Sequence, residues 1–323
     1  MPKKNTILIT GGAGFIGSNL CNYLINKNYQ VLCLDNFDDF YPEQIKKSNI
    51  NNLMNNDSFI LKKGDIRDSD LLDDIFSKYV INAVIHLAAI GGVRNSISNP
   101  QKCFDINVNG SISLFEAMKK HKVKNLIFSS SSSVYGNKTG KLSELDRCDN
   151  QISPYAVSKR TIELLNYNYH INSNFNVINL RLFSIYGKNQ RPDLVLHKYF
   201  NLIFMNKPIE IYGNSDSTRD YTHISDVVNA IYSSICYLDN TENHIYETIN
   251  IGNDNPISLN TLIELVTQTI SNKHIQILEK NFEKGDVTNT HANIDKARKL
   301  LKYTPKIKIE KGIELFYKWY QKK

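Results

Sequence analysis

Short apolar runs of strand length recur through the first 182 residues, separated by stretches in which apolar residues return every three or four positions. The runs predict six buried strands, at residues 5–10, 29–34, 59–62, 83–87, 126–128 and 176–182. The stretches between them predict helices, of which the clearest span residues 15–26, 100–121 and 154–169. Strands that alternate with helices are typical of a parallel, doubly wound sheet, so we expect an α/β protein.

The pattern loosens after residue 182, where it is interrupted by turns at Gly187, Pro192, Pro208 and Gly213. A smaller C-terminal lobe of mixed helices and strands is expected there, and the segment near 220–251 is expected to return to the main sheet. The predicted boundaries are 1–181 plus about 218–251 for the main domain, and about 182–217 plus 252–323 for the smaller lobe.

Composition and charge narrow the class of protein. The chain has 323 residues, of which 41% are hydrophobic and 22% charged, as in an ordinary globular protein. Its formal net charge is +7, but the lysines are scattered and no arginines alternate with aromatic residues, so a nucleic-acid surface is not predicted. No apolar run reaches membrane-spanning length, and the N-terminal one is too short for a signal peptide. We expect a soluble, cytoplasmic protein.

The cysteines give no sign of a metal site or a disulfide framework. Their number is odd, their spacings are wide and no CxxC pair occurs: Cys21, Cys33, Cys103, Cys148 and Cys236. Reduced thiols without a bound metal are therefore expected.

A glycine-rich turn, TGGAGFIG at residues 10–17, lies between the first predicted strand and the first predicted helix. Glycines allow a backbone to approach a pyrophosphate, whose charge is stabilised by the N-terminus of the following helix. A glycine triplet alone is weak evidence and also occurs in ordinary tight turns, but here strand, turn and helix agree. The predicted cofactor-binding residues of this turn are Gly11, Gly14, Phe15, Ile16 and Gly17.

Acidic residues follow two of the later strands. Asp35 closes the second strand, where a carboxylate accepts the ribose hydroxyls of NAD and repels the additional phosphate of NADP. Asn36 follows it, with no arginine beside it. Asp65 and Ile66 follow Gly64, and Asp65 has two open roles, adenine contact or helix N-cap. Together with the glycine turn, these residues predict NAD as cofactor, bound to a Rossmann-type sheet.

Five consecutive serines occur in FSSSSSVYG at residues 128–136. A flexible linker is one interpretation, but the run is short and is followed by SPYAVSK at residues 153–159. In that segment Tyr155 and Lys159 are four residues apart and share one face of the predicted helix. A free tyrosine has a pKa near 10, and lowering it to about 7 requires roughly 4 kcal/mol, which a nearby ammonium and a positive nicotinamide ring can supply. The alternative is a surface Tyr–Lys pair.

Nine segments spread over essentially the whole chain resemble the extended short-chain dehydrogenase/reductase family, that is, the sugar-nucleotide epimerases and dehydratases. They are GGAGFIG, DNFDDFYP, GDIRD, HLAA, the serine run, YAVSK, RLFSIYG, RDYTHISD and GDVTNTHAN. The resemblance implies that Ser131 hydrogen-bonds the sugar 4-hydroxyl beside Tyr155, with Lys159 as the third catalytic residue. It also implies that Ser133 faces the same side as Ser131 if the segment stays extended.

The same resemblance narrows the reaction. Related 4,6-dehydratases carry Asp-Glu where this chain has Ser132 and Ser133, and decarboxylases keep a Glu at the second position; these acids move a proton at C5. Hydroxyls cannot do so, which leaves 4-epimerisation: Tyr155 removes the 4-OH proton, hydride passes from C4 to NAD, the keto sugar rotates, and hydride returns to the other face.

Further positions are carried over from the family. The cofactor set gains Asn107, whose alternative role is polarity within its helix, and the turn after the fourth strand, Leu87, Ala88 and Ala89. Leu194 is also assigned to the substrate pocket. The nucleotide is expected to contact Arg219 through its diphosphate, Tyr212 through uracil and Asp286 through its ribose.

The sugar is predicted from local sequences that most resemble UDP-glucuronate 4-epimerases, namely DNFDDFYPEQIKKSNI, GGVRNSISNP, RPD at 191–193 and GDVTNTHAN. Ser132, Ser133 and Ser184 would donate to the uronate carboxylate, and Arg94 and Arg191 are either cationic contacts or surface arginines. Thr290 leaves room for an N-acetyl sugar, so UDP-glucose and UDP-N-acetylglucosamine 4-epimerases stay open, as do a decarboxylase and a non-catalytic NAD-binding protein.

The resemblance also implies a homodimer. The helices near 100–121 and 154–172 are expected to form its interface, because both carry apolar residues on more than one face.

Overall fold

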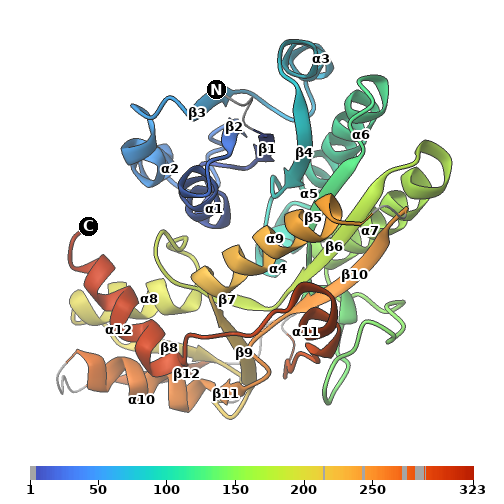
Figure 1. The fold of residues 1–323 in the computed structure, drawn as a ribbon. Coiled ribbons are helices and arrows are strands. Elements are labelled where there is room, and N and C mark those ends of the chain that lie inside the picture. The colour runs from blue at the N-terminus through green and yellow to red at the C-terminus, as the bar shows by residue number, and fades with distance from the viewer. Residues whose placement is uncertain (1–4, 214, 242–243, 271–274, 281–286, 288) are drawn as a thin grey trace.

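The computed structural model describes all residues except 1–4, 214, 242–243, 271–274, 281–286 and 288. Its centre is a seven-stranded sheet in which every pairing is parallel, in the order β10-β6-β5-β4-β1-β2-β3 (Figure 1). The strands are β1 Thr6–Thr10, β2 Gln30–Asp35, β3 Phe59–Lys63, β4 Ile81–His86, β5 Asn125–Ser131, β6 Asn176–Leu182 and β10 Tyr246–Ile251. The α/β prediction is confirmed, and β10, at the end of the segment near 220–251, pairs with β6 in this sheet.

The register brings the carboxyl ends of the strands to one edge. Thr10 pairs with Leu34 on one side and His86 on the other, and Ser131 pairs with Leu182. The glycine turn, Asp35 and the serine run each follow or end one of these strands, so they converge on this edge although they are far apart in sequence.

Helices cover both faces of the sheet, and each face has its own apolar core. Leu20 of α1 and Val227 of α9 belong to one core, and Leu114 of α6 and Ile162 of α7 belong to the other. Figure 1 shows the two sets of helices on opposite sides of the strands. On the first face lie α1 Phe15–Asn26, α2 Glu43–Ile50, α9 Ile224–Asp239 and α11 Asp295–Leu301; on the second lie α3 Ser69–Lys78, α6 Gly110–Lys120 and α7 Pro154–Ser173. A short 3-10 helix, Asn51–Leu53, follows α2.

The helix predicted at 100–121 is not continuous. The short helix α4, Val93–Ser98, is followed by α5, Pro100–Phe104, then a π-helical turn, 105–109, and then α6. Asn107 lies in that turn, fully buried, where its amide pairs with the backbone of Ile90: the Ile90 N–H donates to Oδ1 (2.8 Å) and Nδ2 donates to the Ile90 carbonyl (3.2 Å). These contacts account for the wider turn, because a polar side chain ties the helix to a neighbouring loop.

The serine run does not stay extended, so the condition set for Ser133 is not met. β5 ends at Ser131, and Ser132–Tyr135 form a 3-10 turn. Ser131 caps this turn, because its Oγ accepts from the N–H of Ser133 (3.1 Å). Serine competes for backbone hydrogen bonds in this way, so the strand stops inside the run.

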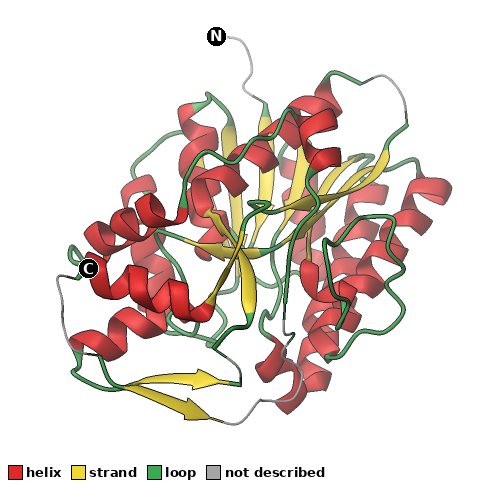
Figure 2. Cartoon of the chain, turned by 90° about the horizontal axis from the view of Figure 1, so that it is seen from below, coloured by secondary structure: helices red, strands yellow, loops and turns green. Residues whose placement is uncertain are grey.

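A smaller lobe lies against the carboxyl edge of the main sheet (Figure 2). It contains a three-stranded sheet in the order β11-β9-β7 and a parallel pair, β8 and β12. The remaining elements are β7 Ser184–Tyr186, α8 Val195–Phe204, β8 Ile209–Tyr212, β9 Thr218–His223, β11 Pro256–Ser258, α10 Leu259–Thr269, β12 Ile277–Lys280 and α12 Ile309–Tyr320. β9 pairs with β7 in this small sheet, whereas α9, which follows it directly, packs on the main one. The boundary predicted near 218 therefore groups β9, a strand of the small sheet, with the main domain, and the boundary at 181 falls one residue before the end of β6.

Candidate active site

A cavity of about 170 Å³ opens at the carboxyl edge beside the glycine turn. Twelve of the residues assigned to the cofactor line it: Gly11, Gly14, Phe15, Ile16, Gly17, Asp35, Asn36, Asp65, Ile66, Leu87, Ala88 and Ala89. Of the other three, Tyr155 lines a second, adjoining cavity, and Lys159 and Asn107 are among the lining residues of neither. Phe15, Ile16 and Arg191 line both cavities, which places them side by side.

The glycine turn fits a pyrophosphate for steric reasons. Gly11 has φ +70°, and a Cβ there would lie 2.8 Å from the backbone nitrogen of Ala88; a Cβ on Gly17 would lie 2.3 Å from the Gly11 carbonyl oxygen. No side chain caps the N-terminus of α1, whose N-cap residue is Gly14. The turn therefore packs tightly while the first backbone N–H groups of α1 remain available to an anion.

Asp35 is 7% exposed and forms part of the cavity wall. Its two carboxylate oxygens accept from the backbone N–H groups of Ala13 (3.0 Å) and Phe37 (2.8 Å). Burial raises the pKa of Asp35 above 3.8, while the hydrogen bond from Phe37 and the charge of Lys46 act in the opposite direction. Each oxygen retains a further lone pair, so the carboxylate can still accept ribose hydroxyls.

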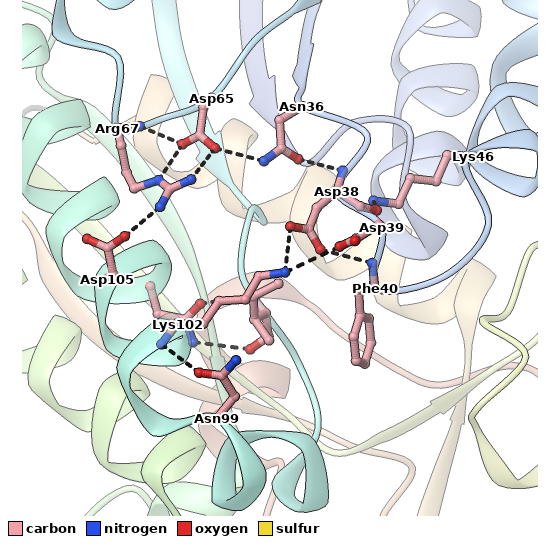
Figure 3. A network of polar contacts seen from close by, with 12 residues as sticks. Asn36, Asp38, Asp39, Phe40, Lys46, Asp65, Arg67, Asn99, Lys102 and Asp105 are labelled. Atoms are coloured by element: carbon pink, nitrogen blue, oxygen red, sulfur yellow. Dashed lines mark hydrogen bonds and ion pairs between the residues drawn. The ribbon is translucent and has the colours of Figure 1, made fainter.

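Asp65 is held by a polar network at the rim (Figure 3). Its oxygens accept from Arg67 Nε (2.9 Å) and Nη2 (2.8 Å) and from Asn36 Nδ2 (2.8 Å), while Arg67 Nη1 also donates to Asp105 (2.5 Å). The bonds from Arg67 lower the pKa of Asp65 to about 2. The N-cap of α3 is instead Asp68, so the capping alternative for Asp65 is wrong.

A second part of the same network joins the loop after β2 to α5. Lys102 Nζ lies 3.1 Å from Asp38 Oδ2 and 3.3 Å from Asp39 Oδ1 (Figure 3). The side chains of Lys102 and Asp38 are 39% and 17% exposed, so this contact is reached by solvent. This ion pair joins the loop after β2, which lines the first cavity, to α5.

The second cavity has a volume of about 520 Å³ and lies between the serine strand and the smaller lobe. Ser129, Ser130, Ser131 and Tyr155 line it from the main domain. The predicted substrate-binding residues that line it are Arg94, Ser184, Arg191, Leu194 and Arg219. Ser132 and Ser133 are half-buried in the 3-10 turn and are not part of this lining. Asp286 and the side chain of Tyr212 lie outside the described residues.

The proposed catalytic residues meet at the wall of this cavity. Tyr155 lies in the first turn of α7, where Ser153 is the N-cap, and Lys159 follows one turn later. Lys159 Nζ donates to the carbonyl of Ser129 (2.7 Å) and stands 5.9 Å from the centre of the Tyr155 ring. Ser131, the last residue of β5, completes the group.

The pKa values of this pair differ from the expectation. Burial raises the pKa of Tyr155 above 10, whereas a hydrogen bond with Ser131 and the positive charge of Arg191 lower it. Burial also lowers the pKa of Lys159 to about 7, which weakens the lysine as a source of positive charge. Within the protein alone, desolvation thus outweighs the stabilisation of a phenolate.

A buried ion pair supports the catalytic strand and helix from behind. The carboxylate of Glu163, on α7, accepts from Arg181 Nε and Nη2, both at 2.9 Å, and from Ser130 Oγ at 2.6 Å. The side chains of Glu163 and Arg181 are 0% and 4% exposed. Because Ser130 precedes Ser131 and Glu163 lies one turn after Lys159, this network fixes the elements that carry the catalytic group.

Arg191 joins the two cavities. Its Nε and Nη2 donate to Asp193 (3.0 and 2.8 Å), and its guanidinium lies 5.0 Å from the centre of the Phe40 ring. A Cβ on Gly91 would lie 2.7 Å from Nη1, so a side chain there would displace the guanidinium. The arginine is therefore largely buried and paired, with its side chain 18% exposed, and its role as a cationic contact for the substrate stays a prediction.

Sequence reasoning missed several residues of the cofactor cavity. The wall also includes Asp38, Phe40, Tyr41 and Lys46 from the loop after β2 and from α2. All four lie inside the segment DNFDDFYPEQIKKSNI, in which the sequence indicated only Asp35 and Asn36 as cofactor-binding residues. Their positions depend on how the loop folds back over β2, a feature with no periodic signal.

The comparisons with known proteins agree with this geometry. Residues 8–316 match the family model described as GDP-mannose 4,6 dehydratase, and the chain belongs to that family. It is 38% identical to UDP-glucuronate 4-epimerase of Thermodesulfobacterium geofontis over 97% of this chain and 95% of that one. The resemblance to sugar-nucleotide epimerases is confirmed.

Solved structures give the same result. UDP-glucuronic acid 4-epimerase of Bacillus cereus, crystallised with UDP-glucuronic acid and NAD, superposes with a TM-score of 0.92 at 35% identity, covering 98% of this chain and 99% of that one. UDP-N-acetylglucosamine 4-epimerase of Methanobrevibacter ruminantium, crystallised with UDP-N-acetylmuramic acid, gives 0.88 at 27% identity and covers 99% of both chains.

Two further findings concern the described residues only. They contain no group of three or more His, Cys, Asp or Glu side chains arranged to hold a metal ion. Every helix within the described ranges is too short or too polar to cross a membrane.

Proposed function

We propose that the protein is an NAD-dependent UDP-sugar 4-epimerase that interconverts UDP-glucuronate and UDP-galacturonate. The observation that carries the proposal is the placement of Ser131 and Tyr155 on the wall of a 520 Å³ cavity that adjoins the glycine-turn cavity, with Lys159 one helical turn behind Tyr155 and bonded to the carbonyl of Ser129. The relatives described above support the same reaction.

The chain's own residues can perform the proton chemistry. Tyr155 takes the proton of the sugar 4-hydroxyl and later returns it, while Ser131 positions that hydroxyl by hydrogen bonding. Lys159, anchored on the Ser129 carbonyl 5.9 Å from the centre of the Tyr155 ring, adds positive charge beside the phenol in its protonated form. When bound in the adjoining cavity, NAD supplies the acceptor and donor of the C4 hydride. Arg219, from β9, is positioned at the wall for the nucleotide diphosphate.

Retention of the carboxylate is the particular problem of a uronate, because a 4-keto uronate is a β-keto acid that loses carbon dioxide readily. The positions of the acids used by dehydratases hold Ser132 and Ser133, and Ser133 Oγ lies 3.1 Å from Ser131 Oγ. Ser184, the first residue of β7, lines the cavity opposite this strand. A hydroxyl donor on the wall at Ser184, with the Ser133 hydroxyl held against Ser131 just outside the lining, can hold the carboxylate without protonating C5.

The test is chromatography of the products formed from UDP-glucuronate, UDP-glucose and UDP-N-acetylglucosamine, each supplied with NAD. We expect UDP-galacturonate from the first with little UDP-pentose, and more decarboxylation when Ser133 or Ser184 is changed to Ala. Abundant UDP-xylose from the parent protein would identify a decarboxylase. Fast turnover of the other two sugars, without reaction of the uronate, would identify the alternative epimerase, which the Methanobrevibacter ruminantium structure favours.

We also propose that the protein is a homodimer. Val157, Leu164, Tyr167 and Ile171 on α7 are 36%, 57%, 53% and 56% exposed, and their spacing places them along one face of the helix. An apolar stripe of this length on an exposed helix is typical of a subunit interface. Light scattering at micromolar concentration tests it, and a monomer would contradict it. We further propose a cytoplasmic location, which the five free cysteines support.

A further inference from the structure

Lys46 is a buried cation in the wall of the cofactor cavity. It lies on α2, its residue is 7% exposed, and it lines the same cavity as Asp35. Its ammonium donates to the carbonyl of Asp38 (2.7 Å) and lies 4.9 Å from the centre of the Tyr41 ring. Figure 3 shows the side chain reaching from α2 towards the loop after β2. A buried ammonium of this kind requires a negative counterpart.

Asp35 is the carboxylate that acts most strongly on this cation, followed by Asp38 and Asp39. Burial lowers the pKa of Lys46 and Asp35 opposes this, while burial raises the pKa of Asp35 and Lys46 opposes that. The carboxylate accepts from backbone N–H groups and the ammonium donates to a backbone carbonyl. Both groups line the same cavity and keep hydrogen-bonding capacity for a ligand.

The other cations near this wall are already neutralised. Arg191, the second cation among the described lining residues, forms its bidentate contact with Asp193. Lys63, whose Cα is paired with that of Asp35 in the sheet, lies 3.3 Å from Glu43 and its side chain is 66% exposed. Lys46 is therefore the cation that a negative group entering beside Asp35 would meet.

We infer that Asp35 and Lys46 together form a masked phosphate site at the 2′ position of the adenosine ribose, and that Lys46 determines what this position accepts once Asp35 is neutral. The inference rests on the proposed binding of NAD, because a carboxylate at the end of β2 marks the ribose 2′-hydroxyl. With Asp35 ionised the site accepts a hydroxyl and repels a phosphate. With Asp35 replaced by a neutral residue, the buried ammonium binds the 2′-phosphate of NADP.

The test is isothermal titration calorimetry with NAD and NADP on four proteins: the parent, Asp35→Ser, Asp35→Ser/Lys46→Met and Asp35→Ser/Lys63→Met. The parent is expected to prefer NAD. Asp35→Ser is expected to gain NADP affinity by about tenfold to 100-fold, the range for a hydrogen bond to a charged group. Adding Lys46→Met should remove that gain, whereas the matched control Lys63→Met should change NADP affinity less than about threefold, because an exposed charge is screened by solvent.

The outcomes separate this inference from the proposed function. A parent protein that binds neither dinucleotide would contradict the proposed function. A parent that binds NAD, with an Asp35→Ser variant that gains no NADP affinity or keeps the gain after Lys46→Met, would overturn the inference alone.

A second measurement applies if Asp35→Ser does not fold. In Lys46→Met, loss of the cation raises the pKa of Asp35. As the pH is lowered, Asp35 is then protonated earlier, so NAD affinity should begin to fall at a higher pH than in the parent. The titratable and charged groups that face Asp35 are Lys46, Asp38, Tyr41 and Cys33, of which only Lys46 is a cation. Identical pH profiles for the two proteins would overturn the inference.

Discussion

The two ends of the proposed site are held by ion pairs of opposite kinds. At the catalytic end, Glu163 and Arg181 form a bidentate pair with almost no exposed surface. At the adenosine end, Lys102 contacts Asp38, and the two side chains are 39% and 17% exposed. The nearby pair of Arg67 and Asp65 is similarly exposed to solvent. Removal of one partner of a buried ion pair leaves the other charge unpaired in a medium of low dielectric. At the surface, water takes the place of the missing partner.

The difference matches what each end has to do. Proton and hydride transfer require the phenol, the hydroxyl and the sugar to be aligned within fractions of an ångström, so rigid support from behind is useful. The adenosine end has to admit and retain a large cofactor. A solvent-exposed ion pair such as Lys102 with Asp38 can separate there at a low cost in free energy. Charge therefore fixes geometry at one end and adjusts affinity at the other.

The largest effect is expected at the catalytic end itself. Tyr155→Phe removes the only proposed base and opens no large cavity, so epimerisation should fall by about 10²- to 10⁴-fold while the fold and NAD binding persist. Turnover is measured by product chromatography, and NAD binding by calorimetry serves as the control. Activity within tenfold of the parent would remove Tyr155 from the mechanism.

Glu163→Gln should break the support of that end. The side chain keeps its size, but Arg181 is left buried and without a counter-charge, which should lower the free energy of unfolding by about 3–5 kcal/mol. Urea denaturation measures this. Glu314→Gln, at an exposed pair with Lys311, is the matched control and should leave stability nearly unchanged. Equal losses in the two variants would mean that burial does not distinguish these pairs.

His86 provides an intermediate, pH-dependent effect. It is 1% exposed, its ring nitrogens contact Thr10 and Ser111 hydroxyls, and burial lowers its pKa to about 3. Because the unfolded chain binds this proton at about pH 6.5, the stability contributed by neutral His86 is full above pH 6.5 and declines as the pH falls towards 3.

Between pH 6.5 and 5 this decline amounts to about 2 kcal/mol. His86→Gln, which cannot titrate, should show a correspondingly smaller difference between unfolding free energies measured by urea at pH 7.5 and 5. A variant with the same pH dependence as the parent would contradict the assignment.

The smallest effect is expected at the rim. Lys102→Met should weaken NAD binding by less than about fivefold at low salt, because an exposed pair contributes about 0.2–1 kcal/mol. The difference from the parent should shrink at 1 M salt, where charges are screened within about 3 Å. A 100-fold loss of NAD affinity in calorimetry would show that the ion pair of Lys102 and Asp38 matters as much as the buried pair of Glu163 and Arg181.

Much of this architecture could be predicted because its signals are local. The buried strands are continuous apolar runs, and the glycine turn has steric requirements that only glycine meets at Gly11 and Gly17. The spacing of Tyr155 and Lys159 is enough to place both on one face of α7.

Other features depended on contacts that have no periodic signal. The sequence of α2 is polar, so it predicts neither this helix nor the burial of Lys46. The π-helical turn follows from a hydrogen-bonded contact between Asn107 and Ile90, and the end of β5 inside the serine run follows from a cap made by Ser131. Each of these is decided by a partner distant in sequence or by competition for a backbone hydrogen bond.

The placement of Arg191 has a thermodynamic consequence. Its guanidinium lies over Phe40 in the cofactor wall and also lines the sugar cavity, so one side chain is a boundary of both compartments. A ligand that alters the position of this side chain in one compartment changes the free energy of binding in the other. Linkage is reciprocal, so a nucleotide sugar that tightens the hold on the dinucleotide is itself held more tightly by the same factor. The shared side chain is thus the physical route by which occupancy of one compartment would be linked to occupancy of the other.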